Sequence, residues 1–143
     1  MADIAETAAK IAVVYPEIAE IINVVSAEAI TAGEALYQTV SGTFGLAQAD
    51  EIAKRQFRGV ALEAVGSGDT LSMLKRGFIS GYALATYEDE IYLSDTPGSF
   101  DTTPGSLLVK CGRVCGLTDP DKTEIAYIEA DWLREWGSSG EVP

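Results

Sequence analysis

Short apolar runs bounded by Gly, Ser, Thr and Pro turns recur along this chain, and one such unit occurs twice. The first copy is residues 31–37 (TAGEALY) and the second is residues 86–98 (TYEDEIYLSDTPG). Each copy passes from a polar turn through a short apolar stretch centred on Leu-Tyr or Ile-Tyr into another turn, a pattern typical of β-strands. Either one hairpin fragment is used twice or two hairpins share turn chemistry by convergence. Both explanations favour a β architecture.

The rest of the chain continues this alternation of strands and turns. Residues 20–30 fit a helical stripe or a strand, and their β-branched content favours a strand. One short helix is expected over residues 51–56, with Asp50 as its N-cap. Other strands are expected at residues 11–15, 36–40, 44–46, 57–65, 70–84 (as two strands), 90–94, 107–117 and 124–129. The sequence therefore predicts a mainly β fold, a small antiparallel β-barrel or sandwich with one short helix.

The length and composition favour one folding unit with extensions at its ends. A chain of 143 residues that is 47% hydrophobic can bury a sizeable core. Pro16 closes the first apolar run, which is expected to be an edge strand or part of an extended arm. We expect an N-terminal arm at residues 1–19, a β-rich domain at 20–136 and a flexible tail at 137–143.

The net charge of −12 argues against a nucleic acid partner, which requires clustered Lys and Arg. No apolar run is long enough to cross a bilayer, and the first residues lack the basic region of a signal peptide, so we expect no membrane partner and synthesis in the cytosol. The positive mean hydropathy favours an oligomer. Basic residues at 54–58 and 75–76 could contact an acidic partner or could simply offset neighbouring acids.

Reactive groups are few. The chain has no histidine, which excludes Ser-His and Cys-His pairs and histidine-ligated metals, so we expect no enzyme activity, catalytic residue or cofactor. Cys111 and Cys115 would lie roughly 13 Å apart on one strand face, too far for a disulfide, and are expected to be small buried thiols. The acidic run 88–90 is interpreted as a solvated turn, and residues 66–68 as a hairpin turn rather than a phosphate loop.

Four segments resemble, in their order and spacing, the tailed-phage capsid decoration (cement, or head-stabilising) proteins. They are residues 30–37 (ITAGEALY), 45–50 (GLAQAD), 58–62 (RGVAL) and 91–98 (IYLSDTPG). The resemblance implies a β-tulip-like domain that assembles as a homotrimer on the outer surface of an icosahedral phage head. It also implies attachment to the major capsid protein after shell expansion, location in the virion after synthesis in the host cytoplasm, and no catalytic residues.

Two sets of residues are candidates for contacts in such an assembly. Ile4, Ile11, Val13 and Tyr15 belong to the predicted arm, which could add to a strand edge of the capsid or of a neighbouring subunit. The second set is a candidate subunit interface, because tryptophan is enriched at interfaces. Its members are Trp132, Leu133 and Trp136. The alternative for this second set is docking of the chain end onto its own core.

A host-adhesion or carbohydrate-binding β module is the alternative function. Exposed aromatic residues such as Tyr82, Tyr87 and Trp136 could stack on sugars, whereas burial of these residues would weaken this interpretation. A small β-barrel enzyme or ligand binder would instead need a pocket with convergent polar groups.

Overall fold

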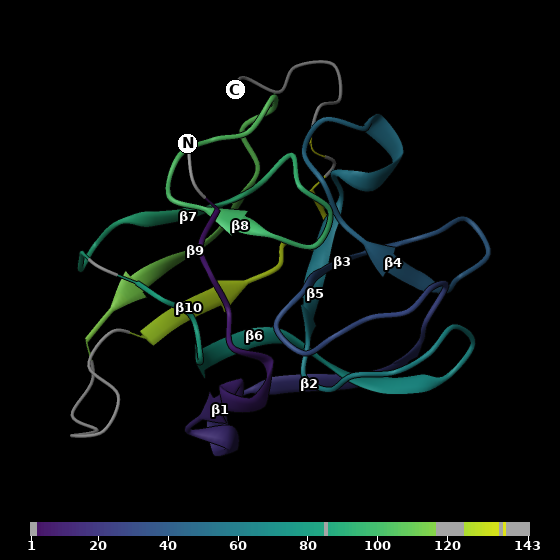
Figure 1. Cartoon of the computed structure of the whole chain (residues 1–143), viewed down its shortest axis with the longest axis horizontal. Coiled ribbons are helices and arrows are strands. Elements are labelled where there is room, and N and C mark those ends of the chain that lie inside the picture. Colours follow the sequence, from purple (N-terminus) through teal and green to yellow (C-terminus); the bar gives the residue numbers. More distant parts are fainter. Residues whose placement is uncertain (1–2, 85, 117–124, 135, 137–143) are drawn as a thin grey trace.

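The computed structural model describes residues 3–84, 86–116, 125–134 and 136, which form a mainly β structure (Figure 1). Three single turns of 3₁₀ helix are present among them: η1 (Ala8–Lys10), η2 (Pro16–Ile18) and η3 (Ile52–Lys54). The strands are β1 (Ala12–Val14), β2 (Glu20–Val25), β3 (Ala35–Gln38), β4 (Phe44–Leu46), β5 (Phe57–Ala61), β6 (Thr70–Ser80), β7 (Glu90–Leu93), β8 (Phe100–Asp101), β9 (Lys110–Cys115) and β10 (Ile125–Glu129). The prediction of a mainly β fold of the small barrel or sandwich type is confirmed.

All the named strands belong to one antiparallel sheet that curls on itself. Its main path runs β4-β3-β5-β6-β10-β9-β7-β8, and β1 and β2 both pair with β6. Figure 1 shows β7 to β10 on one side of the molecule and β3 to β5 on the other, with β6 connecting the two halves. The curl brings the inner faces of the two halves together around a common core.

Strand β6 organises this sheet because it pairs with four other strands. On one edge it pairs with β2 and then with β1, and on its other edge with β5 and β10. We predicted two strands in this region, but a single strand continues through Gly77. Close backbone approach at Gly77 and Gly81 is confirmed: a Cβ atom at these positions would lie 3.3 Å from the Ala19 Cα and 2.9 Å from the Ile11 Cα, respectively.

Two hydrophobic clusters stabilise the sheet. The larger lies inside the curl and includes Phe57, Leu74 and Ile79. The smaller lies on the opposite face of β3, β5 and β6 and is formed by Val24, Ile30, Leu36, Phe44, Ala61, Leu71 and Met73. Successive residues of a strand point to opposite faces, so the buried neighbours on β6 contribute to different clusters. This half of the sheet is therefore buried on both faces.

The helix predicted over residues 51–56 is wrong, since only the single 3₁₀ turn η3 forms there. Glu51, not Asp50, stands at the N-cap position and makes no side-chain cap hydrogen bond, while the Asp50 carboxylate accepts a hydrogen bond from Gln48 Nε2 at 2.7 Å. The turn contains no buried residue, so it lacks the packed face that stabilises most short helices.

The two cysteines do not share a strand face as predicted. In the pairing of β7 with β9, Ile91 lies opposite Gly112 and Tyr92 opposite Lys110, so Cys111 is the extra residue of a β-bulge. The bulge shifts the alternation of side chains, and Cys111 is buried while Cys115 is partly exposed. Both thiols are free, and only one of them is a core residue.

Candidate functional site

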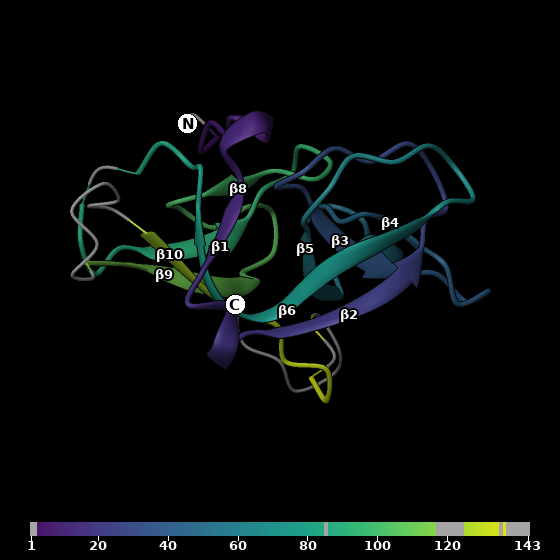
Figure 2. The same ribbon diagram turned by 90° about the horizontal axis from the view of Figure 1, so that it is seen from below.

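Residues 3–14, here called the strap, lie across the chain's own sheet instead of extending from it (Figure 2). Backbone hydrogen bonds join Ile4 N to Phe100 O at 2.7 Å, Thr7 N to Gly81 O at 2.9 Å and Ala83 N to Ala5 O at 2.8 Å. Strand β1 then pairs with the last residues of β6. The predicted arm does add to a strand edge, but in this structure the edge belongs to the same chain.

The local reason for this docking is the unpaired edge of β6. Strand β2 pairs with β6 only up to Arg76, so the backbone of residues 78–80 would remain unpaired on that edge without β1. An unpaired strand edge is a template for a further strand, and the β-branched residues of β1 suit that position.

The residues predicted for capsid binding differ in exposure. Ile4 is buried in the main core, and Ile11 and Val13 are partly buried against it. Tyr15 is 36% exposed, and its ring packs edge-on against Phe78 with ring centroids 6.4 Å apart. Most of the apolar surface of the strap is therefore used inside the chain, and Tyr15 is the member of the set most available to a partner.

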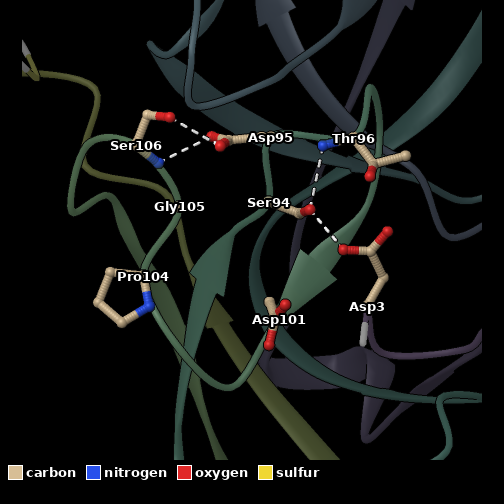
Figure 3. Close-up of a pocket in the computed structure, with 8 residues that line it drawn as sticks. All are labelled: Asp3, Ser94, Asp95, Thr96, Asp101, Pro104, Gly105 and Ser106. Atoms are coloured by element: carbon tan, nitrogen blue, oxygen red, sulfur yellow. Dashed lines mark hydrogen bonds between the residues drawn. The ribbon is translucent and has the colours of Figure 1, made fainter. Parts of the chain in front are cut away.

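A polar pocket of about 430 Å³ lies where the strap begins (Figure 3). It is lined by Asp3, Ser94, Asp95, Thr96, Asp101, Pro104, Gly105 and Ser106. The Ser94 hydroxyl donates a hydrogen bond to the Asp3 carboxylate and accepts one from the Thr96 backbone N–H at 3.0 Å. These bonds fasten the first described residue of the strap to the loop that follows β7.

The other carboxylates of the pocket brace its loops. Asp95 accepts hydrogen bonds from the Ser106 N–H at 2.8 Å and from its hydroxyl at 2.7 Å, and Asp101 accepts one from the Thr103 N–H at 3.1 Å. No group of acids or thiols in the described residues is arranged to hold a metal ion. The carboxylates of the pocket therefore accept hydrogen bonds from the serines and backbone N–H groups of its own loops.

Glu6 carries the most unusual environment in the strap. Its Oε2 atom is buried without a hydrogen-bond partner, and a Cβ atom at Gly33 would lie only 2.4 Å from it. Burial, and secondarily the charge of Glu34, raise the pKa of Glu6 from 4.5 to about 7. Next to it the Tyr82 hydroxyl donates a hydrogen bond to the Gly33 carbonyl at 2.6 Å. Burial, followed by the charge of Glu6, raises the pKa of Tyr82 well above its usual value.

The four sequence segments at 30–37, 45–50, 58–62 and 91–98 meet in the structure. Their backbones are joined by hydrogen bonds from Ala35 N to Gly98 O, Gly98 N to Ala47 O, Ala49 N to Ser94 O and Ala61 N to Glu34 O, all of 2.8 to 2.9 Å. The last segment also supplies Ser94, Asp95 and Thr96 to the polar pocket. These turn-and-strand segments therefore form one connected part of the fold.

Sequence reasoning missed Glu6 and most of the residues across the pocket. Asp101 and Ser106 lie in a stretch that carries no motif, and Glu6 sits among ordinary exposed residues of the strap. The glycines at positions 33 and 98 were the available sign of close packing. Each leaves room for a glutamate side chain, Glu6 at Gly33 and Glu34 at Gly98.

The tryptophans of the predicted interface pack within the chain. Trp136 is only 5% exposed, and Trp132 is partly buried, with its Nε1 donating to the Arg58 carbonyl at 2.8 Å. Leu133 between them is 100% exposed. Docking of the chain end onto its own core therefore describes the two tryptophans, and Leu133 is the residue of this set that faces solvent.

The aromatic residues considered for sugar binding do not form an exposed strip. Trp136 is buried, and Tyr82 packs against Phe100 with ring centroids 5.8 Å apart, whereas Tyr87 is 52% exposed. The observation that would have favoured a carbohydrate-binding surface is therefore absent for these three residues.

The chain was compared with known proteins. No protein-family model matches it, and no curated protein matches its sequence. Within the described residues, no helix combines the length and apolar character that a membrane crossing requires.

Proposed function

We propose that this chain is a structural virion protein that binds the outer surface of an icosahedral phage head as a homotrimer, contacts the major capsid protein and stabilises the expanded shell. The observation that carries the proposal is the meeting of the four family-like segments. They were selected by order and spacing in the sequence, and they are hydrogen-bonded to one another in the fold. Such a cluster supports a shared architecture more strongly than any single turn motif does.

A stabilising role requires no chemical reaction. A subunit that binds the expanded shell and not the immature one lowers the free energy of the expanded state, by about 2.7 kcal/mol per site at a concentration of 100 times Kd. A trimer strengthens three modest contacts through effective concentration. The chain's lack of histidine and its polar pocket of mutually bonded loops agree with a binding role.

Two exposed apolar residues are the best candidates for the two kinds of contact. Tyr15 directly follows the strap, lies in the left-handed backbone region with φ of 57°, and presents part of its ring to solvent. Leu133 projects from the turn that follows β10. We assign Tyr15 to the capsid contact and Leu133 to the contact between subunits. The adhesion alternative is less well supported, since two of its three aromatic residues pack internally.

The test is a sedimentation assay with purified protein, undecorated expanded heads and immature proheads. Saturable binding to expanded heads and not to proheads is expected. Tyr15→Ala should weaken binding at least tenfold, whereas Tyr87→Ala, which removes another exposed tyrosine, should bind like the wild type. Absence of wild-type binding to either particle would contradict the proposal, and equal effects of the two variants would contradict the assignment of Tyr15.

The oligomeric state is measured separately by analytical ultracentrifugation. The wild type is expected to sediment as a trimer, and Leu133→Ser should shift the trimer towards monomer. Val40→Ser is the matched control, because Val40 is also fully exposed but lies at the tip of the β3–β4 hairpin. A monomeric wild type would refute a trimer formed before docking, and an unchanged Leu133→Ser trimer would refute the interface assignment.

A further inference from the structure

Many favourable contacts hold the strap on the sheet, and one contact opposes its docking. The favourable contacts include its backbone hydrogen bonds to residues 81, 83 and 100, the pairing of β1 with β6, and the buried Ile4 side chain. The unfavourable one is the Glu6 carboxyl, which enters the space left by the missing side chain of Gly33 and has no hydrogen-bond partner at Oε2. Glu6 is half-buried, and the buried Oε2 atom without a partner is tolerated far better when the carboxyl is neutral than when it is charged.

The groups around Glu6 offer no compensation for a negative charge. From the loop before β3, Glu34 contributes a second carboxylate, which accepts a hydrogen bond from the Thr31 N–H at 2.7 Å. From the segment after β6, Tyr82 contributes a phenol whose hydrogen is already donated to Gly33. On the strap itself, Asp3 is bonded to Ser94, and Lys10 is exposed. Among the described residues, no lysine or arginine forms an ion pair with Glu6.

We propose that the strap is a proton-controlled latch, docked when the Glu6 carboxyl is neutral and released more often when that carboxyl loses its proton. Release would return Glu6 to water and withdraw Ile4 from its contact with Phe100. It would also free the edge of β6 at residues 78–80 for another strand. The latch therefore couples proton concentration to the availability of a strand edge.

The direction of the pH effect follows from the two states of Glu6. In the docked strap its pKa is about 7, and in the released strap the carboxyl is solvated, with its ordinary value of 4.5. Below pH 4.5 both states are protonated and the docking contributes its full stability. As pH rises towards 7, docking loses stability because the docked state must keep a proton that the released state gives up. Above pH 7 the loss is complete, and the opening equilibrium no longer changes with pH.

Amide hydrogen exchange on the full chain tests this proposal directly. The informative amides are Thr7 and Ala83, whose hydrogen bonds join the strap to the segment that follows β6. After correction for the intrinsic pH dependence of exchange, their opening equilibrium constants should rise at least tenfold between pH 5 and pH 8. The Leu62 amide, which is bonded to the Ser72 carbonyl at 3.0 Å in the other half of the sheet, serves as the internal reference.

Three variants distinguish the latch from general loosening. Glu6→Gln keeps the shape of the side chain but cannot ionise, so its Thr7 and Ala83 amides should show no pH dependence of opening. Glu34→Gln should move the upper end of the transition to a lower pH, since the neighbouring charge is removed. Glu17→Gln removes an exposed carboxylate of η2 and should keep the wild-type profile.

Two outcomes would overturn the proposal. One is a wild-type opening equilibrium that does not change between pH 5 and pH 8. The other is a Glu6→Gln profile that follows the wild type, which would assign the pH dependence to a different group. Circular dichroism of each variant checks that the sheet is intact. The measurement uses the chain alone, so its result is independent of head binding.

Discussion

Gly112 on β9 passes so close to β10 that a Cβ atom there would lie 1.9 Å from the Tyr127 carbonyl oxygen. Gly112→Ala is therefore expected to displace paired backbone and to lower the free energy of unfolding by about 3 kcal/mol or more. Gly42→Ala is the matched control, because Gly42 has φ of +90° but open space around it, so only backbone strain of about 1–2 kcal/mol applies. Urea denaturation measures the free energy of unfolding of both variants. Equal decreases would show that the close contact between Gly112 and β10 does not determine the cost of the substitution.

For single residues, the sequence predicts those roles that depend on the residue type and its neighbours in the chain. Gly77 and Gly81 were expected at close backbone approaches because a glycine inside a strand usually has such a role. The bulge at Cys111 could not be predicted, since it depends on how β7 pairs with β9. The raised pKa of Glu6 depends on Gly33 and Glu34, which reach it through the fold, so no pattern near Glu6 indicates it.

Two hydrogen bonds between Gln56 and the backbone of Trp136 hold the segment after β10 against the sheet. Gln56 Nε2 donates to the Trp136 carbonyl at 2.7 Å, and its Oε1 accepts from the Trp136 N–H at 2.7 Å. Gln56→Ala should cost about 1–3 kcal/mol, because it leaves backbone polar groups of a buried residue unpaired. Gln56→Glu keeps the acceptor but places a carboxylate oxygen against the Trp136 carbonyl, so it should also destabilise the chain. Tryptophan fluorescence during urea unfolding provides the measurement, and an effect of Gln56→Ala within 0.5 kcal/mol of zero would contradict this role.

Elements with a strong local pattern were predicted, and elements defined by long-range pairing were not. The strand at 20–25 follows from its β-branched residues, and the turn at 41–43 follows from its Ser-Gly-Thr sequence. The strap was expected to leave the domain, because a β-forming segment before a proline does not reveal which strand edge it will join. The free edge of β6 exists only where β2 ends, a property of the assembled sheet.

The whole molecule carries 22 acidic and 10 basic residues, so its own charge opposes compaction at neutral pH. At low salt, the melting temperature should be higher at pH 5.5 than at pH 8, because Glu6 has a pKa of about 7 in the fold and must ionise in a half-buried position at the higher pH. Addition of 0.5 M NaCl at pH 8 should raise the melting temperature by the amount that repulsion among the acidic residues had lowered it, because salt screens such charges. The remaining difference should disappear in Glu6→Gln.

The window for this comparison stays above pH 5 because another carboxylate acts in the opposite direction. The hydrogen bond from Tyr92, followed by Lys110 and Arg113, lowers the pKa of Glu90. A lowered pKa contributes stability above the ordinary value of 4.5, and this contribution is lost as pH falls below it. Differential scanning calorimetry at pH 5.5 and 8 makes the measurement, and a higher melting temperature at pH 8 would contradict the expectation.

The docking of the strap also constrains the order in which the chain can fold during synthesis. Ile4 leaves the ribosome long before its hydrogen-bond partner Phe100 has been made, and at about 5–20 residues per second this interval lasts roughly 5–20 seconds. The β-forming residues at 12–14 likewise have no strand to join until residues 78–80 of β6 have been made. The charged residues Asp3, Glu6 and Lys10 beside them then disfavour aggregation of this apolar segment until Phe100 has been synthesised.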